Sequence, residues 1–326
     1  MGCSLSDLNC CFTSRPGGRG TLNFTDLTTE GDHDTEVEQK VYSWDVREKK
    51  PACIIENAKD CEVIRQSKGE QVIVRNCVNS RIYLLDWTSS ATIDDCRDCV
   101  IIVAAVGGSL FMRDTNSTTL VAASAQLRLR DCGDIHLFSG CESDPIIESS
   151  QNVLVAPYFL SYKGIDEHFK AANLDPFKAI HWGNVYDFTP SNPPNWSKLK
   201  EPFDMNKFIP PPGTNDSLLE PYPGFSVGPE KSFVPVILDT CQDNASMVLF
   251  PETRRQEALE FIQGCQIASS SLLLTTVQDA RPEDGNEKVV ALLFSAPVDN
   301  LPVANIANVR VTDEQRKISH YFNKSQ

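Results

Sequence analysis

Short runs of alternating apolar and polar residues recur between about residues 52 and 157. The clearest are VIVRNCVNS, ATIDDCRDC, SLFMRDTNS and LRLRDCGDI, which end at Ser80, Cys99, Ser117 and Ile135. Each is a β-branched or Leu-rich run that is followed by Asn or Asp, a small residue and a turn. This pattern predicts short strands separated by tight turns.

The repeats have a nearly constant length. Cys77, Cys96, Thr115 and Cys132 occupy equivalent places at spacings of 19, 19 and 17 residues, and Cys61 stands at a similar place 16 residues before Cys77. A period near 18 with two or three strands per period predicts a parallel β-helix, in which coils stack and equivalent residues form ladders. Cys suits the tight inward corner of such a coil, so the ladder accounts for much of the cysteine content.

One repeat, ASAQLRLRDCGD, has an unusual outer row in this acidic chain. In a strand, Leu127 and Leu129 point into the coil, whereas Gln126, Arg128 and Arg130 point outward. An ordinary solvated row of charges is one interpretation of these three residues.

Glu148 supports a second interpretation of the row. It lies 20 residues after Arg128, about one coil further on. At that position its carboxylate can hold the Arg128 guanidinium by a charge-assisted hydrogen bond. An arginine held in this way is preorganised to meet an anion.

The pattern changes after the repeats. FLSYKGIDEHFKAANL predicts a helix within residues 158–189, and residues 190–231 are rich in proline. Further on, SMVLFP predicts a strand, ETRRQEALEFIQG a helix that ends at Gly264, and SSLLLTTVQ and KVVALLFSA two more strands. A last helix is predicted from about residue 299, most clearly in EQRKISHYF. This order indicates a small α/β domain.

Together these elements predict a mainly β protein, a right-handed parallel β-helix with a smaller C-terminal α/β domain. We expect an N-terminal flexible tether over residues 1–40 and the β-helix domain over 41–190. A Pro-rich linker over 191–231 and the small domain over 232–326 complete the chain.

Charge and composition narrow the function. The chain of 326 residues has a formal net charge of -14, which argues against nucleic acid as its partner. No run approaches the roughly 18 apolar residues of a membrane span, and no apolar segment near the start is typical of a secretory signal. We therefore expect the 12 cysteines to lie in a reducing compartment, where disulfides are rare.

Cys96 and Cys99 form a C-x-x-C motif. Zinc sites usually need a second such pair or suitably spaced histidines, and a redox pair usually has a thioredoxin-like βαβ context. Neither accompanies this motif, so we expect a structural role and no metal.

The first residues, MGCSLSDLNCCF, contain the pattern M-G-x-x-x-[ST], which marks Gly2 for myristoylation. Cys3 lies beside it, where palmitoylation is common, and Cys10 and Cys11 are further candidates. A single myristoyl chain binds membranes only marginally, whereas two lipids anchor stably. The sequence therefore predicts attachment to a membrane through myristoyl and palmitoyl chains, a coincidental Met-Gly start being the alternative.

The repeat region resembles a known family. Its coils, Gln126-Leu127-Arg128, Arg130-Asp131-Cys132 and the stretch PIIESS are similar to the domain of tubulin-folding cofactor C, called the TBCC or C-CAP domain. The resemblance is closer to the dual-acylated members of this family. Their N-terminus, their YSWDxRE entry segment and their segment after the β-helix resemble MGC, YSWDVRE and VYDFT here.

The resemblance implies a GTPase-activating protein for Arf-like small GTPases. Arg128 would be the arginine finger, Gln126 would contact the switch region and help to place the catalytic glutamine of the GTPase, and Glu148 would orient Arg128. Phe188 would pack at the interface, and Arg130 would contact the partner from the same face. A core aromatic and a structural salt bridge with a neighbouring coil are the alternatives for Phe188 and Arg130.

The resemblance further implies that GTP and Mg²⁺ belong to the partner and that the chain needs no cofactor of its own. It implies the cytoplasmic face of the plasma membrane, a cilium or basal body, and the transport of lipidated proteins. Ala125 departs from the pattern, because the closer relatives have a second glutamine there; this affects one partner contact and the choice of GTPase.

Two further functions stay open. The chain could be a non-catalytic GTPase effector or scaffold, or a tubulin-folding factor with tubulin as its partner, although the acylation signal argues against a purely cytosolic factor. The closer relatives also carry a nucleoside-diphosphate-kinase-like domain. Here that domain is abbreviated and His320 is its only histidine, so we expect no kinase activity and no stand-alone enzymatic activity.

Overall fold

The structure is a computed structural model that describes residues 52–200, 204–209, 219–237, 245–268, 274–281, 288–302 and 310–313. The predicted tether and lipidation sites Gly2, Cys3, Cys10 and Cys11 lie outside these residues, as do the YSWDVRE segment and His320. Within the described residues no helix is both long enough and apolar enough to cross a bilayer.

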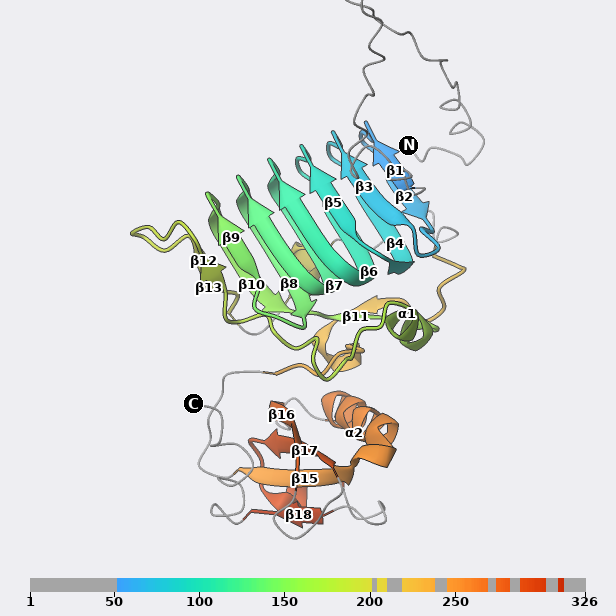
Figure 1. The fold of residues 1–326 in the computed structure, drawn as a ribbon, viewed down its shortest axis with the longest axis vertical. Helices are drawn as coiled ribbons and strands as arrows, with labels where there is room; N and C mark the ends of the chain where they lie inside the picture. Colours follow the sequence, from blue (N-terminus) through green and yellow to red (C-terminus); the bar gives the residue numbers. More distant parts are fainter. Residues whose placement is uncertain are drawn as a thin grey trace, which may run out of the picture. The chain divides into compact units, whose positions relative to one another are not determined.

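Strands between Ala52 and Lys198 form a parallel β-helix, as the repeat predicts. One side of the coil is the parallel run β1-β3-β5-β6-β7-β9-β12, whose strands lie side by side in Figure 1. These strands are β1 (Ala52–Glu56), β3 (Gln71–Arg75), β5 (Ala91–Asp94), β6 (Val100–Arg113), β7 (Asn116–Arg130), β9 (Ile146–Glu148) and β12 (Tyr186–Asp187).

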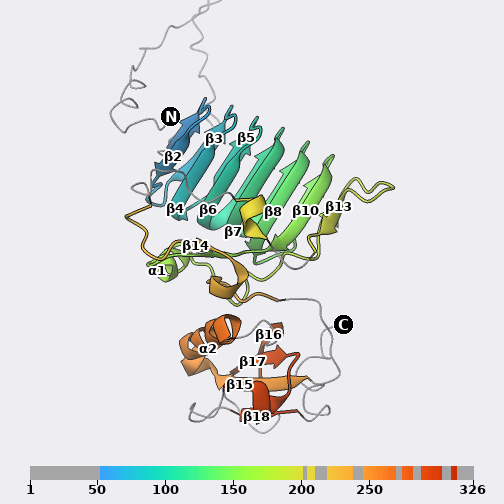
Figure 2. The same ribbon diagram turned by 180° about the vertical axis from the view of Figure 1, so that it is seen from behind.

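A second side of the coil also consists of parallel strands, seen from behind in Figure 2. The long strands β6 and β7 bend around the coil and contribute to both sides. The remaining strands of the second side are β2 (Glu62–Arg65), β4 (Arg81–Thr88), β8 (Gly133–Cys141), β10 (Gln151–Pro157) and β13 (Trp196–Lys198).

Each coil turns a corner with two residues in the left-handed region, three positions apart. Asn, Asp and Ser occupy these sites because their short polar side chains tolerate positive φ better than branched ones do. The pairs are Asn57 and Asp60, Asn76 and Asn79, Asp95 and Asp98, Asp114 and Ser117, Asp131 and Asp134, and Ser149 and Asn152. The Asn or Asp that recurs in the sequence repeat is therefore the residue with positive φ at which the coil turns.

In successive corners, the small residue that follows the first turn residue makes the same hydrogen bond. Its S–H or O–H donates to the backbone carbonyl two residues earlier, with donor–acceptor distances of 3.3 Å from Cys77, 3.3 Å from Cys96, 2.8 Å from Thr115 and 3.2 Å from Cys132. Cys, Ser and Thr interchange along the ladder because each can supply this donor. Burial also raises the pKa of the Cys132 thiol to about 11, as expected for an unreactive structural cysteine.

The prediction for Cys61 was wrong in one respect. The register places Cys77, Cys96, Thr115 and Cys132 in one ladder, as expected. Cys61 lies in a second ladder three positions on, together with Ser80, Cys99 and Thr118. The short distance of 16 residues between Cys61 and Cys77 reflects this difference, because Cys61 follows the second turn residue of its corner, whereas Cys77 follows the first.

Cys96 and Cys99 are both buried and belong to neighbouring ladders, in which each thiol donates to a backbone carbonyl. In the described part of the chain no group of three or more His, Cys, Asp or Glu residues is arranged to hold a metal ion. The motif thus arises from two adjacent corner positions.

After the last full coil the chain packs along the β-helix. The helix α1 (Ile165–Ala171) buries Ile165 and Phe169, in the segment where a helix was predicted. The strand β11 (Leu160–Ser161) pairs antiparallel with β14 (Ser226–Val227), and the short helical turns η2 (Met205–Lys207) and η4 (Pro229–Lys231) lie between Pro-rich stretches.

The C-terminal segment combines strands with a helix, as predicted, and its strands form a four-stranded sheet. The sheet order is β16-β17-β15-β18 and every pairing is antiparallel. The elements are β15 (Ser246–Pro251), η5 (Glu252–Arg254), α2 (Arg255–Ala268), β16 (Leu274–Ala280), β17 (Val289–Phe294), η6 (Val298–Asn300) and β18 (Arg310–Thr312).

Two details of this segment differ from the prediction. The helix α2 continues through Gly264 to Ala268, because a glycine weakens a helix without ending it when flanking residues are buried. A strand, β18, stands within the region predicted as a last helix. EQRKISHYF itself lies outside the described residues.

Candidate functional site

The side formed by β1, β3, β5, β6, β7, β9 and β12 presents an outer face that we call the wall. In-register pairing aligns its outward side chains in rows. One row, here the arginine row, contains Ile54, Ile73, Thr92, Phe111, Arg128, Ile146 and Tyr186. The next, the charged row, contains Glu56, Arg75, Asp94, Arg113, Arg130 and Glu148.

The opening pattern of β7 folds as expected. Leu127 and Leu129 are buried inside the coil, while Gln126 and Arg130 are exposed and Arg128 is partly exposed. The alternation thus places three polar side chains on the wall and fixes them by the rigid, buried strand beneath.

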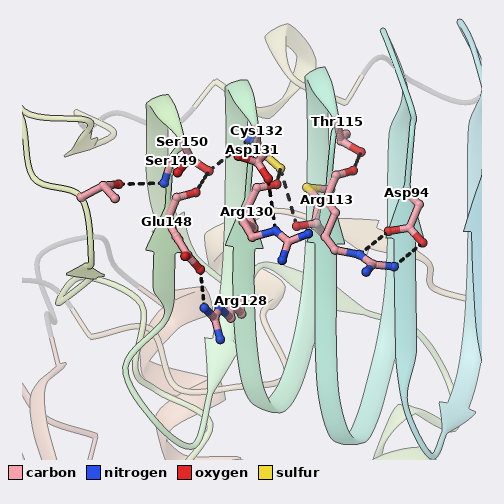
Figure 3. Close-up of polar contacts among 12 residues, drawn as sticks. Asp94, Arg113, Thr115, Arg128, Arg130, Asp131, Cys132, Glu148, Ser149 and Ser150 are labelled. Atoms are coloured by element: carbon pink, nitrogen blue, oxygen red, sulfur yellow. Dashed lines mark hydrogen bonds and ion pairs between the residues drawn. The ribbon is translucent and has the colours of Figure 1, made fainter.

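Glu148 binds Arg128, as its spacing suggested. The Arg128 guanidinium donates through Nη2 to Oε2 of Glu148 on the neighbouring coil, and Figure 3 shows the two side chains pointing toward one another. About 41% of the Arg128 side chain is exposed, so the guanidinium retains donors that face solvent.

This pairing departs from the rest of the charged row. Elsewhere the row forms ion pairs between in-register neighbours, Arg75 with Glu56 at 2.5 Å and Arg113 with Asp94 at 2.7 Å. Glu148 is the register partner of Arg130, but its carboxylate is turned to Arg128 instead. The guanidinium of Arg130 binds Asp131 at 3.1 Å (Figure 3).

Phe188 is a surface residue, and the alternative of a core aromatic was wrong. Its side chain is 53% exposed, and the Arg128 guanidinium lies 5.6 Å from its ring centroid. A cation over an aromatic face is attracted by the ring quadrupole. Phe188 and Glu148 therefore contact the same guanidinium, Glu148 from the coil that follows β7 and Phe188 from the coil after that.

The backbone around Phe188 is fixed by its neighbours. The Phe188 N–H donates to the carbonyl of Ile147 at 2.9 Å, and the Thr189 N–H donates to Asp187 Oδ1 at 2.9 Å. Thr189 Oγ1 in turn accepts from the Ser149 N–H at 2.7 Å. These contacts continue the parallel pairing of β9 and β12 beyond the end of β12.

Gln126 and Arg130 lie on either side of Arg128 along β7. Gln126 Oε1 accepts from the Ser109 hydroxyl at 3.1 Å, and Gln126 is exposed on the wall. The salt bridge of Arg130 is with its sequence neighbour Asp131, so the alternative of an ion pair with a neighbouring coil was wrong in its partner.

The sequence interpretation missed two large side chains beside Arg128. Phe111 is its register neighbour on the preceding coil and is 41% exposed, and Tyr186 lies two coils on in the same row and is 60% exposed. Phe111 stands 17 residues before Arg128, one repeat length earlier, at an outward position of SLFMRD. That spacing was the signal that could have identified it.

Residues 69–188, which include this site, match the family model described as Tubulin binding cofactor C. The chain carries a tubulin binding cofactor C domain. This agrees with the parallel β-helix and with the resemblance that the repeat motifs carry.

Three curated relatives are similar to this chain. Protein XRP2 of Mus musculus is 35% identical over 215 residues, 64% of this chain and 58% of the relative. Protein XRP2 of Danio rerio is 33% identical over 242 residues, 72% of this chain and 60% of the relative. Tubulin-folding cofactor C of Arabidopsis thaliana is 39% identical over 108 residues, 32% of this chain and 31% of the relative. The chain thus spans less than two thirds of the length of each of these relatives.

Proposed function

We propose that this protein is a GTPase-activating protein for an Arf-like small GTPase and that Arg128 is its arginine finger. The observation that supports this most directly is the pairing of Glu148. The Glu148 carboxylate binds the partly exposed Arg128 rather than Arg130, its register partner. A purely structural charged row would continue the in-register pairs seen for Arg75 and Arg113.

The chemistry of GTP hydrolysis suits such a group. Negative charge accumulates on the phosphoryl oxygens and on the leaving oxygen in the transition state, and a cation supplied in trans stabilises it by about 10³ to 10⁵ in rate. Arginine suits this role because its planar fork binds two oxygens at once and stays charged. GTP and Mg²⁺ belong to the GTPase.

The neighbours of Arg128 have separate tasks in this proposal. Glu148 restricts the guanidinium to one side of the wall, which lowers the entropy lost when it enters the nucleotide site. Gln126 has free amide donors for the switch region of the GTPase, and Phe188 offers an exposed apolar contact. Arg130 contacts the partner from the same strand.

The proposal places this reaction at a membrane. Gly2 and Cys3 would carry myristoyl and palmitoyl chains, which hold the protein on the cytoplasmic face of the plasma membrane. By resemblance, the setting is a cilium or basal body, where hydrolysis on the GTPase ends the release of lipidated cargo.

A single-turnover measurement tests the proposal. An Arf-like GTPase is loaded with GTP, the full-length protein is added at increasing concentration, and phosphate release is followed. The proposal expects a saturable acceleration of at least about 10³-fold with one of the GTPases tested. Saturable binding without acceleration by any of them would instead make the protein an effector or scaffold.

A further inference from the structure

Exposed apolar side chains concentrate on the wall. The described residues include six exposed large apolar side chains, and four of them, Ile54, Phe111, Tyr186 and Phe188, are outward residues of this face. Single exposed apolar residues are ordinary, whereas several on one face mark an interaction surface.

The arginine row places these residues on both sides of Arg128. Phe111 precedes it by one coil, Ile146 follows by one coil and Tyr186 by two. With adjacent strands about 4.8 Å apart, the span from Phe111 to Tyr186 is about 14 Å. Tyr186 also packs edge to face on Phe188, with ring centroids 4.9 Å apart.

The charges of the wall place one half-exposed guanidinium, that of Arg128 in its ion pair with Glu148, within this apolar strip. Arg75 and Arg113 are neutralised by Glu56 and Asp94, and both belong to the charged row. Arg128 is the ionisable residue of the arginine row between Phe111 and Tyr186. A complementary partner presents a buried anion that is bordered on both sides by apolar surface, as a nucleotide-bound GTPase does at its phosphate opening.

We propose that Phe111 and Tyr186 form an apolar bracket that seats a GTP-loaded small GTPase on either side of Arg128. The inference rests on the proposed function and adds two partner-binding residues to it. In the complex the two rings cover apolar surface of the GTPase and exclude water around the guanidinium. Exclusion of water strengthens the attraction between Arg128 and the phosphate, because the local dielectric falls.

The bracket determines the affinity for the GTPase, whereas Arg128 determines the maximal rate of GTP hydrolysis. Aromatic anchors near the centre of an interface carry much of its binding energy, and their truncation commonly weakens binding about tenfold or more. Neither ring touches the transferred phosphoryl group in this arrangement. Loss of one ring is therefore expected to raise the protein concentration needed for half-maximal activation while the maximal rate remains.

The test compares full-length Phe111→Thr and Tyr186→Thr with wild type in the single-turnover assay. Threonine keeps the β-branched character that strands prefer, and urea unfolding confirms that each variant folds. Ile267→Thr on α2 is the matched control, since Ile267 is 68% exposed and belongs to α2 rather than to a strand of the wall. Each bracket variant is expected to raise the half-maximal concentration about tenfold, with maximal rates within about threefold and the control unchanged.

The failure of the bracket and the failure of the proposed function are distinguishable. If wild type accelerates hydrolysis and both bracket variants match it in half-maximal concentration, the bracket is wrong and the arginine finger stands. If wild type binds the GTPase without acceleration, the same variants are compared by their Kd, and an unchanged Kd again overturns the bracket. If wild type self-associates in sedimentation and Phe111→Thr abolishes only that, the strip binds a second copy and the inference is wrong.

Discussion

The carboxylate of Glu148 binds Arg128, 20 residues away, although the parallel register places Glu148 opposite Arg130. The contact is diagonal across two adjacent coils, and it removes Glu148 from the line of ion pairs that runs along the charged row. The half-exposed Arg128, a residue of the arginine row, is therefore held by a carboxylate of the charged row.

Glu148→Gln tests this relationship. The amide keeps the shape and one acceptor oxygen but loses the charge that makes the hydrogen bond to Arg128 strong. The difference between a charged and a neutral hydrogen bond is about 1–1.5 kcal/mol, or roughly tenfold in rate. We expect the maximal rate of activated GTP hydrolysis to fall about tenfold with the half-maximal concentration nearly unchanged. A variant as active as wild type would show that Glu148 does not position Arg128.

Substitutions of two neighbouring residues of β7, Leu129 and Arg128, should have different effects on stability. Leu129 is fully buried in the coil, so Leu129→Ala should lower the free energy of unfolding by about 2–5 kcal/mol. Arg128→Ala removes only a partly exposed ion pair and should change it by about 1 kcal/mol or less. Urea titration of both variants checks the expectation. Equal losses would mean that Arg128 is a structural residue of the coil.

The ladder that contains Thr115 predicts that loss of the Thr115 hydroxyl lowers the free energy of unfolding. The Thr115 hydroxyl donates to the Arg113 carbonyl at 2.8 Å and accepts from the Cys96 N–H at 3.3 Å. Thr115→Val keeps the shape but leaves both buried backbone groups without this partner, which costs about 1–3 kcal/mol. Thr115→Cys is the control, because cysteine makes the same bond elsewhere in the ladder. In urea unfolding, Thr115→Val should have a lower free energy of unfolding than Thr115→Cys. The reverse order would contradict the account.

One histidine should make stability depend on pH. Burial lowers the pKa of His168 below its usual 6.5, with the charges of Asp86, Glu167 and Asp166 acting in the opposite direction. The unfolded chain then binds more protons than the folded one, so this contribution to stability is present above pH 6.5 and is lost as the pH falls below it.

His168→Gln isolates this effect. Glutamine can still accept from the Tyr162 hydroxyl, which lies 2.8 Å from His168 Nδ1. Between pH 7.5 and 5.5, wild type should lose more of its free energy of unfolding than the variant, as measured by urea titration at each pH. An equal loss in the two proteins would show that His168 keeps its ordinary pKa.

Much of the fold could be predicted from the repeat alone, because each coil of a β-helix corresponds to one period of the sequence. The spacing of Cys77, Cys96, Thr115 and Cys132 predicts the ladder that the register confirms. Cys61 was misplaced because each corner contains two similar turn residues, and a local pattern does not distinguish them. Gly264 does not end α2, because helix propensity takes no account of the buried contacts that continue the helix.

The site was predicted in part. Arg128 and Glu148 come together as their separation of about one coil suggests. The diagonal geometry could not be predicted, since the step from Arg128 to its register neighbour Ile146 is 18 residues and side-chain reach covers the rest. Phe111 and Tyr186 were missed because exposure on one row becomes visible only when the coils are aligned.

The most direct test of the central claim compares Arg128→Ala with Arg75→Ala. Arg75 is a matched control because it is an exposed arginine of the same wall that also forms an ion pair with the neighbouring coil. Single-turnover GTP hydrolysis is measured at saturating concentration of each variant, and binding to the GTP-loaded GTPase is measured in parallel. The account predicts that Arg128→Ala still binds but loses about 10³-fold or more of the acceleration, while Arg75→Ala matches wild type. Retained acceleration by Arg128→Ala would contradict the assignment of the arginine finger.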